Sequence, residues 1–150
     1  MQKLFLLILI LFHLSFINSY AQMPDCSKVL FYEDNITIGS CVLNVYKADT
    51  YEQKLCGMLN FTDKTFYKDG MIFTGNSKRI ESHNFHTMGM NMTIRIMGIV
   101  LNENGKYSVY NKDTKYSPPN IPSVTIYGNA VFETSEHKYN KLKSCLYNKE

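Results

Sequence analysis

The chain has 150 residues, a formal net charge of +3 and a hydrophobic fraction of 45%. This length predicts one folded domain, and the composition excludes a disordered, collagen-like or low-complexity chain. The 16 basic and 13 acidic side chains are interleaved along the sequence, so charge nominates no nucleic acid or other polyanion as a partner.

Residues 1–21 have the pattern of a secretory signal peptide. Lys3 precedes an apolar run at 4–17, and residues 19–21 (Ser-Tyr-Ala) form a small-x-small cleavage site. The run has about 14 residues, fewer than the roughly 20 that a membrane-spanning helix needs. We therefore expect cleavage near Ala21 and a mature domain of residues 22–150, secreted or periplasmic and without a stable membrane span. Retention of the segment as an anchor is the alternative.

Four cysteines follow this segment, and an even number of thiols delivered to an oxidising space predicts two disulfides. They are Cys26, Cys41, Cys56 and Cys145. Three pairings are possible, and the sequence alone does not choose among them. The absence of a Cys-x-x-Cys pair excludes a thioredoxin-type motif and the usual zinc spacing. A hydrolase with a Cys nucleophile assisted by His83 or His86 stays a remote alternative.

Two stretches in the first half of the mature chain predict strands. Residues 36–47 alternate loosely between apolar and polar types and are rich in β-branched residues, with a break near Gly39 and Ser40. They predict one or two strands. After a polar loop at 60–69, the short apolar segment 71–73 predicts a buried strand.

A helix is expected between these stretches. Thr50 and Gln53 have the spacing of a capping box, in which each residue satisfies a free backbone N–H of the other. One face of the helix should then be apolar, because three residues recur at intervals of four. They are Tyr51, Leu55 and Leu59.

The segment 83–101 has the strongest periodicity in the chain. From His86 to Ile96 every even position is apolar or His, and this strict alternation predicts one strand with a buried face. Asn104 and Gly105 follow between two apolar runs and predict a hairpin with a type I′ turn.

The C-terminal part predicts a loop, a strand and a helix. Three prolines make 116–123 a loop, residues 130–133 predict a strand, and 136–146 predict a closing helix. The apolar side of this helix should contain Tyr139, Leu142 and Leu146. The expected fold is a small β-rich α+β domain with a barrel-like or strongly bent mixed sheet, two short helices and a core of about 36–146.

Several segments resemble, in their order and spacing, the motifs of a prokaryotic family of domains of unknown function numbered 192 (DUF 192). These are Ala48-Asp49-Thr50, Gly57-Met58-Leu59, Gly70-Met71-Ile72-Phe73, His86-Thr87-Met88-Gly89-Met90 and the hairpin Val100-Leu101-Asn102-Glu103-Asn104-Gly105. The likeness extends from about Leu43 to Leu142. It implies a compact β-rich domain, often behind an export signal, with no established enzymatic activity.

The resemblance also implies where a ligand pocket would lie, around the His-Thr-x-Gly-Met motif and the strand after it. The residues expected there are Phe85, His86, Thr87, Gly89, Met90 and Arg95. Arg95 is a departure, because the family places Asp between the two apolar residues at that point. A binding role of that Asp would be lost or inverted in this chain.

The same segment offers a second interpretation, a Cu(I) site. Thioether sulfurs and imidazole nitrogens are soft donors that select Cu(I), and alternate residues of one strand can converge on one ion. The ligands would be His86, Met88, Met90 and Met92. The competing interpretation is a plain core strand, because Met is also an ordinary gap-filler.

No catalytic constellation is evident, since the sequence contains no phosphate-binding Gly-rich loop, no nucleophile elbow and no His-Glu-x-x-His motif. In a eukaryotic host Asn35 and Asn60 would be glycosylation acceptors. The sequence therefore predicts an exported binding module for an unknown small ligand or protein, without a cofactor. Copper binding is the alternative function.

Overall fold

The computed structural model describes residues 24–75 and 77–148, so the predicted signal peptide lies outside the described residues. The elements in chain order are η1 (Cys26–Lys28), β1 (Tyr32–Ile38), β2 (Cys41–Ala48), α2 (Tyr51–Cys56), β3 (Gly70–Thr74), β4 (Glu81–Phe85), β5 (Ile94–Leu101), β6 (Tyr107–Ser117), β7 (Val124–Gly128), β8 (Ala130–Ser135) and α3 (Glu136–Leu146). Six strands form a closed barrel in the order β1-β2-β3-β8-β5-β6, and β4 pairs with β7 in a separate two-stranded sheet. The predicted β-rich α+β fold is confirmed.

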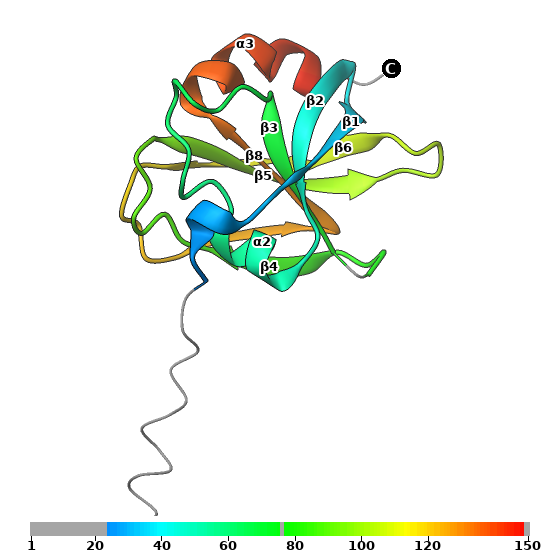
Figure 1. The fold of residues 1–150 in the computed structure, drawn as a ribbon. Helices are drawn as coiled ribbons and strands as arrows, with labels where there is room; N and C mark the ends of the chain where they lie inside the picture. The colour runs from blue at the N-terminus through cyan, green and yellow to red at the C-terminus, as the bar shows by residue number, and fades with distance from the viewer. Residues whose placement is uncertain (1–23, 76, 149–150) are drawn as a thin grey trace, which may run out of the picture.

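The barrel has two differently covered ends (Figure 1). Helix α3 packs over one end, and α2 lies with β4 at the opposite end. Two buried apolar clusters follow this division. One contains Leu43, Ile72, Ile99, Phe132 and Leu146, with Tyr139 and Leu142 of α3 packed against it. The other contains Met58, Phe66, Phe73, Met90, Met92, Ile94 and Ile96.

The predicted strand break at Gly39 and Ser40 is the turn between β1 and β2, which are antiparallel. Gly39 has φ +58°, and a Cβ there would lie 2.5 Å from the carbonyl oxygen of Cys145. Glycine is therefore required both by backbone conformation and by space. The barrel closes beside this turn, where Ile38 pairs with Tyr107 in the parallel contact of β1 with β6.

Helix α2 has the predicted capping box. The Gln53 backbone N–H donates to the Thr50 hydroxyl at 3.2 Å, and the Gln53 side-chain oxygen accepts from the Thr50 N–H at 3.0 Å. The predicted apolar face was wrong, because Tyr51 is exposed and the helix buries Gln53 and Cys56 instead. The Gln53 amide nitrogen also donates to the Leu30 carbonyl at 2.7 Å, which ties the N-terminal segment to the helix.

The single strand predicted for His86 to Ile96 is wrong. Strand β4 ends at Phe85 and β5 begins at Ile94, so residues 86–93 form a loop between two sheets. The physical reason lies in backbone conformation and anchoring. Gly89 has φ +78°, outside the extended region. Thr87 is hydrogen-bonded by its backbone and its hydroxyl to residues 118–121 of the loop 118–123, which contains three prolines and is called the proline-rich loop below. The polar and apolar alternation in this stretch reflects a folded loop.

The C-terminal elements match the sequence more closely. Strand β8 contains the predicted residues 130–133, and α3 has the predicted bounds. The hairpin between β5 and β6 forms, but its turn is not type I′, because Asn104 is not among the described residues with positive φ while Gly105 has φ +79°. The N–H of Asn102 donates to the Lys106 carbonyl at 2.8 Å and that of Gly105 to Asn102 at 3.1 Å, which describes a type I turn followed by a glycine bulge. Strands β4 and β7 were not predicted.

Both predicted disulfides are present, and the structure supplies their pairing. Cys26 is bonded to Cys56, and Cys41 to Cys145. The first fastens η1 to α2, and the second fastens the start of β2 to α3. No helix within 24–75 or 77–148 is long and apolar enough to cross a membrane.

Candidate functional site

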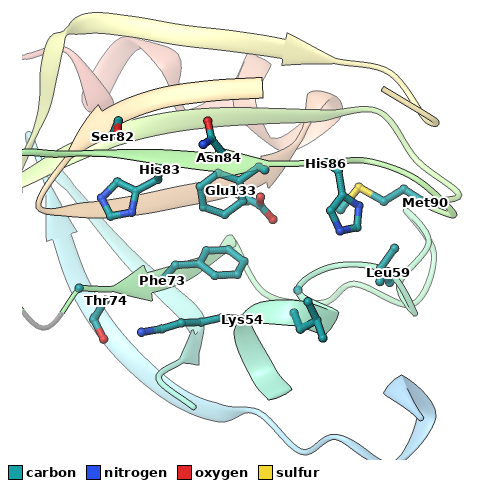
Figure 2. A pocket seen from close by; sticks show the side chains of 14 residues that line it. Lys54, Leu59, Phe73, Thr74, Ser82, His83, Asn84, His86, Met90 and Glu133 are labelled. Atoms are coloured by element: carbon teal, nitrogen blue, oxygen red, sulfur yellow. The ribbon is translucent and has the colours of Figure 1, made fainter. Parts of the chain in front are cut away.

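A cavity of about 410 Å³ lies at the α2 end of the barrel, between α2, the end of β3, β4 and the loop that follows β4. We call it the Glu133 pocket (Figure 2). It is lined by Lys54, Leu55, Gly57, Leu59, Phe73, Thr74, Gly75, Ser82, His83, Asn84, Phe85, His86, Met90 and Glu133. Seven of these fourteen residues have polar side chains, five are aliphatic or aromatic and two are glycines, so the lining combines apolar surface with several polar groups.

Glu133 occupies a position in β8 where a core residue is expected. Its neighbours across the sheet are Met71 on β3 and Ile96 on β5, both completely buried. Side chains alternate along a strand, so Glu133 and Val131 face the cluster at the α2 end, whereas Phe132 faces the cluster at the α3 end. The Glu133 side chain points into the pocket (Figure 2).

The carboxyl group of Glu133 is buried without compensation. The residue is 2% exposed, and its Oε2 atom has no hydrogen-bond partner. Burial raises the pKa of Glu133 from an ordinary 4.5 to about 8, because the low-dielectric surroundings disfavour the charged form. Near neutral pH the group is therefore a protonated acid, able to donate one hydrogen bond and to accept others.

His86 contributes a second buried polar atom without a partner to the same cavity. Its Nδ1 is buried and makes no hydrogen bond. His83, two residues before the end of β4, differs because its ring Nε2 lies 3.0 Å from the Gly128 carbonyl oxygen, to which it can donate. Only three buried side-chain nitrogen or oxygen atoms lack partners in the described part of the chain, and two of them belong to Glu133 and His86.

Aromatic rings form the wall between these groups and α2. Phe73 and Phe85 contact each other edge to face, with ring centroids 5.3 Å apart. Gly57 caps the C-terminus of α2 with φ +45°, and a Cβ on it would lie 3.3 Å from the Phe73 ring and 3.9 Å from the Glu133 carboxylate. A larger residue at this position would be strained by the positive φ and would press on the Phe73 ring, whereas its distance to Glu133 is an ordinary contact.

Thr74, in the pocket lining at the end of β3, borders an ion pair that lies outside the lining. The Thr74 hydroxyl donates to the Asp49 carboxylate, and the Lys47 ammonium lies 3.1 Å from the same carboxylate. Burial acts to raise the pKa of Asp49, but these two partners outweigh it and hold that pKa below its ordinary value. In Figure 2 the Lys54 side chain extends toward Thr74, away from Glu133.

Of the ligand-pocket residues that the family resemblance implied, Phe85, His86 and Met90 line the Glu133 pocket and three do not. The Thr87 hydroxyl donates to the Pro118 carbonyl at 2.6 Å and accepts from the Ile121 N–H at 2.8 Å. The Gly89 N–H donates to the Asn120 side chain at 3.1 Å. Both residues therefore hold the loop 86–93 against the proline-rich loop.

Arg95 lies elsewhere and has its own partners. Its guanidinium makes a bidentate ion pair with Glu136, with nitrogen to oxygen distances of 2.5 and 3.1 Å. It also lies over the rings of Tyr116 and Tyr139, at 4.8 and 4.9 Å from their centroids. The Glu136 carboxylate raises the pKa of Arg95, and Arg95 lowers that of Glu136. This cluster joins β5 to α3 and does not line the pocket.

The methionines of the copper hypothesis are divided. Met88 is 50% exposed, whereas Met90 and Met92 are buried in the cluster at the α2 end. The alternating strand face on which the hypothesis depended does not form, although His86 and Met90 do line one cavity. Within the described ranges no group of three His, Cys, Asp or Glu side chains is placed to hold a metal ion.

The remaining predicted sites are the cysteines and two asparagines. All four cysteines are in disulfides, so the described chain has no thiol for a Cys nucleophile. Asn35 and Asn60 are both exposed.

Glu133 and Phe73 line the pocket but were not among the site residues predicted from the sequence. The sequence does contain a sign of the Glu133 site, because this charged residue directly follows Val131 and Phe132 in a predicted buried strand.

Comparisons with known proteins add information about the fold. No family model and no curated protein matches the chain. One matching solved structure is described as a "putative transcription regulator" from Sinorhizobium meliloti, with a TM-score of 0.54, 12% identity and coverage of 77% of this chain and 90% of that one. Another is a protein of unknown function from Novosphingobium aromaticivorans, with a TM-score of 0.53, 17% identity and coverage of 81% and 84%. At these identities the likeness establishes a shared fold and nothing about activity.

Proposed function

We propose that this protein is a small extracytoplasmic module that binds a small organic ligand in the Glu133 pocket. The observation that carries the proposal is the pair of unpartnered polar atoms, Glu133 Oε2 and His86 Nδ1, in the lining of one cavity. A buried polar atom without a partner costs about 1–3 kcal/mol, and a ligand that satisfies both atoms would recover part of that cost.

The extracytoplasmic location is supported by the cysteines. Two disulfides in a chain of this size are typical of proteins that fold in an oxidising compartment, and the pattern of residues 1–21 is that of an export signal. Mass spectrometry of the native secreted protein should find an N-terminus at Gln22 and no free thiol. A protein that retains residues 1–21 or reduced cysteines would contradict this location.

Membership of the DUF 192 family is part of the same proposal. It is supported by the series of motifs, which the fold distributes over α2, β3, the loop 86–93 and the β5–β6 hairpin. Superposition on a solved family member should align Gly57, Gly70 and His86 with the corresponding motif residues. A displacement of these positions by more than a residue or two would contradict membership.

Ligand binding can be tested by screening small amines, alcohols and carboxylates against the isotopically labelled protein by NMR. We expect binders to shift the amide resonances of α2, of residues 85–90 and of Glu133. Leu59→Trp places a large ring at the half-buried pocket wall and should abolish these shifts, whereas Met88→Trp, at an exposed position outside the lining, should not. Equal binding by both variants would contradict a site in the Glu133 pocket.

Copper binding is a second candidate, favoured by the presence of His86 and Met90 in one cavity and by the free Nδ1 of His86. Under this hypothesis protein produced with copper carries near-stoichiometric Cu(I). The replacement of Met88 and Met90 by Leu should then remove the metal. Metal-free protein, unchanged by the double replacement, would exclude this function.

A further inference from the structure

The buried carboxyl group of Glu133 needs a positive charge or hydrogen-bond donors from a bound molecule if it is to ionise. It lies in the wall of a cavity large enough for a small organic molecule, and it is 2% exposed. A carboxylate in such surroundings is stabilised only by a nearby positive charge or by several hydrogen-bond donors. The protein provides no hydrogen bond to Oε2.

No cation of the described chain pairs with Glu133. Its register partners on β3 and β5, Met71 and Ile96, carry no charge. The remaining titratable groups in the pocket lining are Lys54 on α2, His83 on β4 and His86 after β4. Lys54 extends toward Thr74, where it acts on Asp49, and burial is the sole cause of the raised pKa of Glu133. The position opposite the carboxyl group is thus free for a charge from outside.

The walls around the carboxyl group suit an organic cation. Phe73 and Phe85 present aromatic rings, and Leu59 and Met90 add aliphatic and thioether surface. Aromatic faces attract ammonium ions, most strongly where water is excluded. In the tautomer with its proton on Nε2, His86 offers Nδ1 as a second acceptor.

We propose that the Glu133 pocket binds a small primary ammonium ion with an aryl or alkyl substituent. This inference rests on the proposed function and names its ligand class. The ammonium donates one hydrogen bond to the Glu133 carboxylate and one to His86 Nδ1, and its substituent packs against the Phe73 and Phe85 rings that line the cavity. On binding, the protonated Glu133 carboxyl loses its proton to solvent, and the ammonium ion keeps all of its own. One proton is therefore released for each ion bound.

The test uses benzylammonium as the probe, with benzyl alcohol and benzoate as neutral and anionic probes of similar shape. Isothermal titration calorimetry in two buffers of different ionisation enthalpy should show release of about one proton per benzylammonium at about pH 6.5. The apparent affinity should rise about tenfold from about pH 6 to about pH 7, while benzylammonium itself stays charged.

Two variants distinguish the effect of the Glu133 carboxyl group from the effect of losing one negative charge anywhere on the protein. Glu133→Gln keeps the shape of the side chain and should weaken benzylammonium binding roughly 10–100-fold and abolish proton release. Glu81→Gln removes a carboxylate from the exposed strand β4 outside the lining and should change neither. Titration of the ¹³C-labelled Glu133 carboxyl in the wild-type protein gives the same information without a variant, because benzylammonium should move its signal to the carboxylate position.

The outcomes are distinguishable. Binding of benzyl alcohol or benzoate in the pocket with no binding of benzylammonium would overturn the ammonium inference and leave the proposed ligand site intact. Benzylammonium binding without proton release, or equal in Glu133→Gln and wild type, would also overturn it. If none of the three probes and no member of the screened amines, alcohols and carboxylates moved the pocket resonances, both the inference and the proposed function would fail.

Discussion

The end of the barrel beneath α3 and the end beside α2 differ in how their polar side chains are paired. At the α3 end Arg95 is bonded to Glu136, and the buried Thr134 hydroxyl donates to the Asp69 carbonyl at 2.6 Å. At the α2 end Glu133 and His86 each keep a buried atom without a partner. Both residues line one cavity, whereas the third residue of the described chain with an unpartnered buried atom, Asn44, does not. The ligand site proposed at the α2 end rests on this difference.

Removal of the disulfides should have the largest effect on stability, and it compares the two ends of the barrel because each bridge fastens one of them. Cys41–Cys145 closes a loop of 104 residues and Cys26–Cys56 one of 30. Because a bridge across a longer loop removes more entropy from the unfolded chain, replacing Cys41 and Cys145 by Ala should lower the free energy of unfolding by about 5 kcal/mol. Replacing Cys26 and Cys56 by Ala should lower it by about 4 kcal/mol. Urea denaturation of the two double variants measures both. A larger loss of unfolding free energy in the variant without Cys26–Cys56 would show that the α2 end depends more on its bridge than chain entropy predicts.

The pH dependence of stability should come mainly from Glu133. Its pKa is raised from 4.5 to about 8 on folding, so between these values the folded state binds more protons than the unfolded state. The free energy of unfolding should therefore fall as pH rises through this window, by about 1.4 kcal/mol per pH unit. Glu133→Gln should flatten the slope, whereas Glu81→Gln should keep it. Urea denaturation at a series of pH values decides between these outcomes, and a slope that survives in Glu133→Gln contradicts the assignment.

The carboxylates at the other end act in a different pH range. The pKa of Glu136 is lowered by its bond to Arg95. Its contribution is therefore present above about pH 4.5 and is lost as the pH falls through the lowered value. One pH titration of stability should therefore separate the two ends, with a loss for Glu136 as the pH falls below about 4.5 and a loss for Glu133 as the pH rises from 4.5 to about 8.

Removal of the N-terminal helix caps should have a smaller effect on the stability of the two ends. Thr50 caps α2 and Ser135 caps α3, each accepting from a backbone N–H in the first turn. Replacement of either by Ala should cost about 1 kcal/mol. Because α2 has only six residues and borders the cavity, Thr50→Ala should also increase amide exchange around the pocket. Unchanged exchange at α2 in Thr50→Ala would mean that Cys56 and Gln53 hold the helix without its cap.

The smallest effect is expected at the Arg95–Glu136 pair. Both side chains are partly exposed, so Arg95→Met should cost no more than about 1 kcal/mol, and the cost should shrink in high salt. Thermal denaturation at low and high ionic strength measures this. A loss of several kcal/mol, insensitive to salt, would show that stacking on Tyr116 and Tyr139 carries the stabilisation instead.

Much of the fold follows from local sequence signals. The capping box of α2, the turn at Gly39, the core strand β8 and the whole of α3 are each specified by residues near one another in the chain. Strands β4 and β7 are not, because they pair across a separation of about 45 residues and contain exposed polar positions. Their pairing depends on the barrel being present.

The pocket was predictable only in part for the same reason. Phe85, His86 and Met90 belong to one conspicuous segment, and the family resemblance placed them near a ligand. Glu133 is distant in sequence, and it becomes a pocket residue only because β8 pairs with both β3 and β5. The error at residues 86–96 came from periodicity alone, which does not distinguish a strand from a loop whose alternate side chains are buried.

The long-range bridge between Cys41 and Cys145 also determines the order in which the chain can become oxidised. A chain that emerges N-terminus first exposes Cys26, Cys41 and Cys56 well before Cys145. During that interval an odd number of thiols is present, and Cys41 can pair wrongly with either neighbour through a shorter loop than the native Cys26–Cys56 bridge. The Gln53 side chain of α2 donates to the Leu30 carbonyl, so a local contact beside Cys26 and Cys56 favours the native pair over both wrong pairings of Cys41.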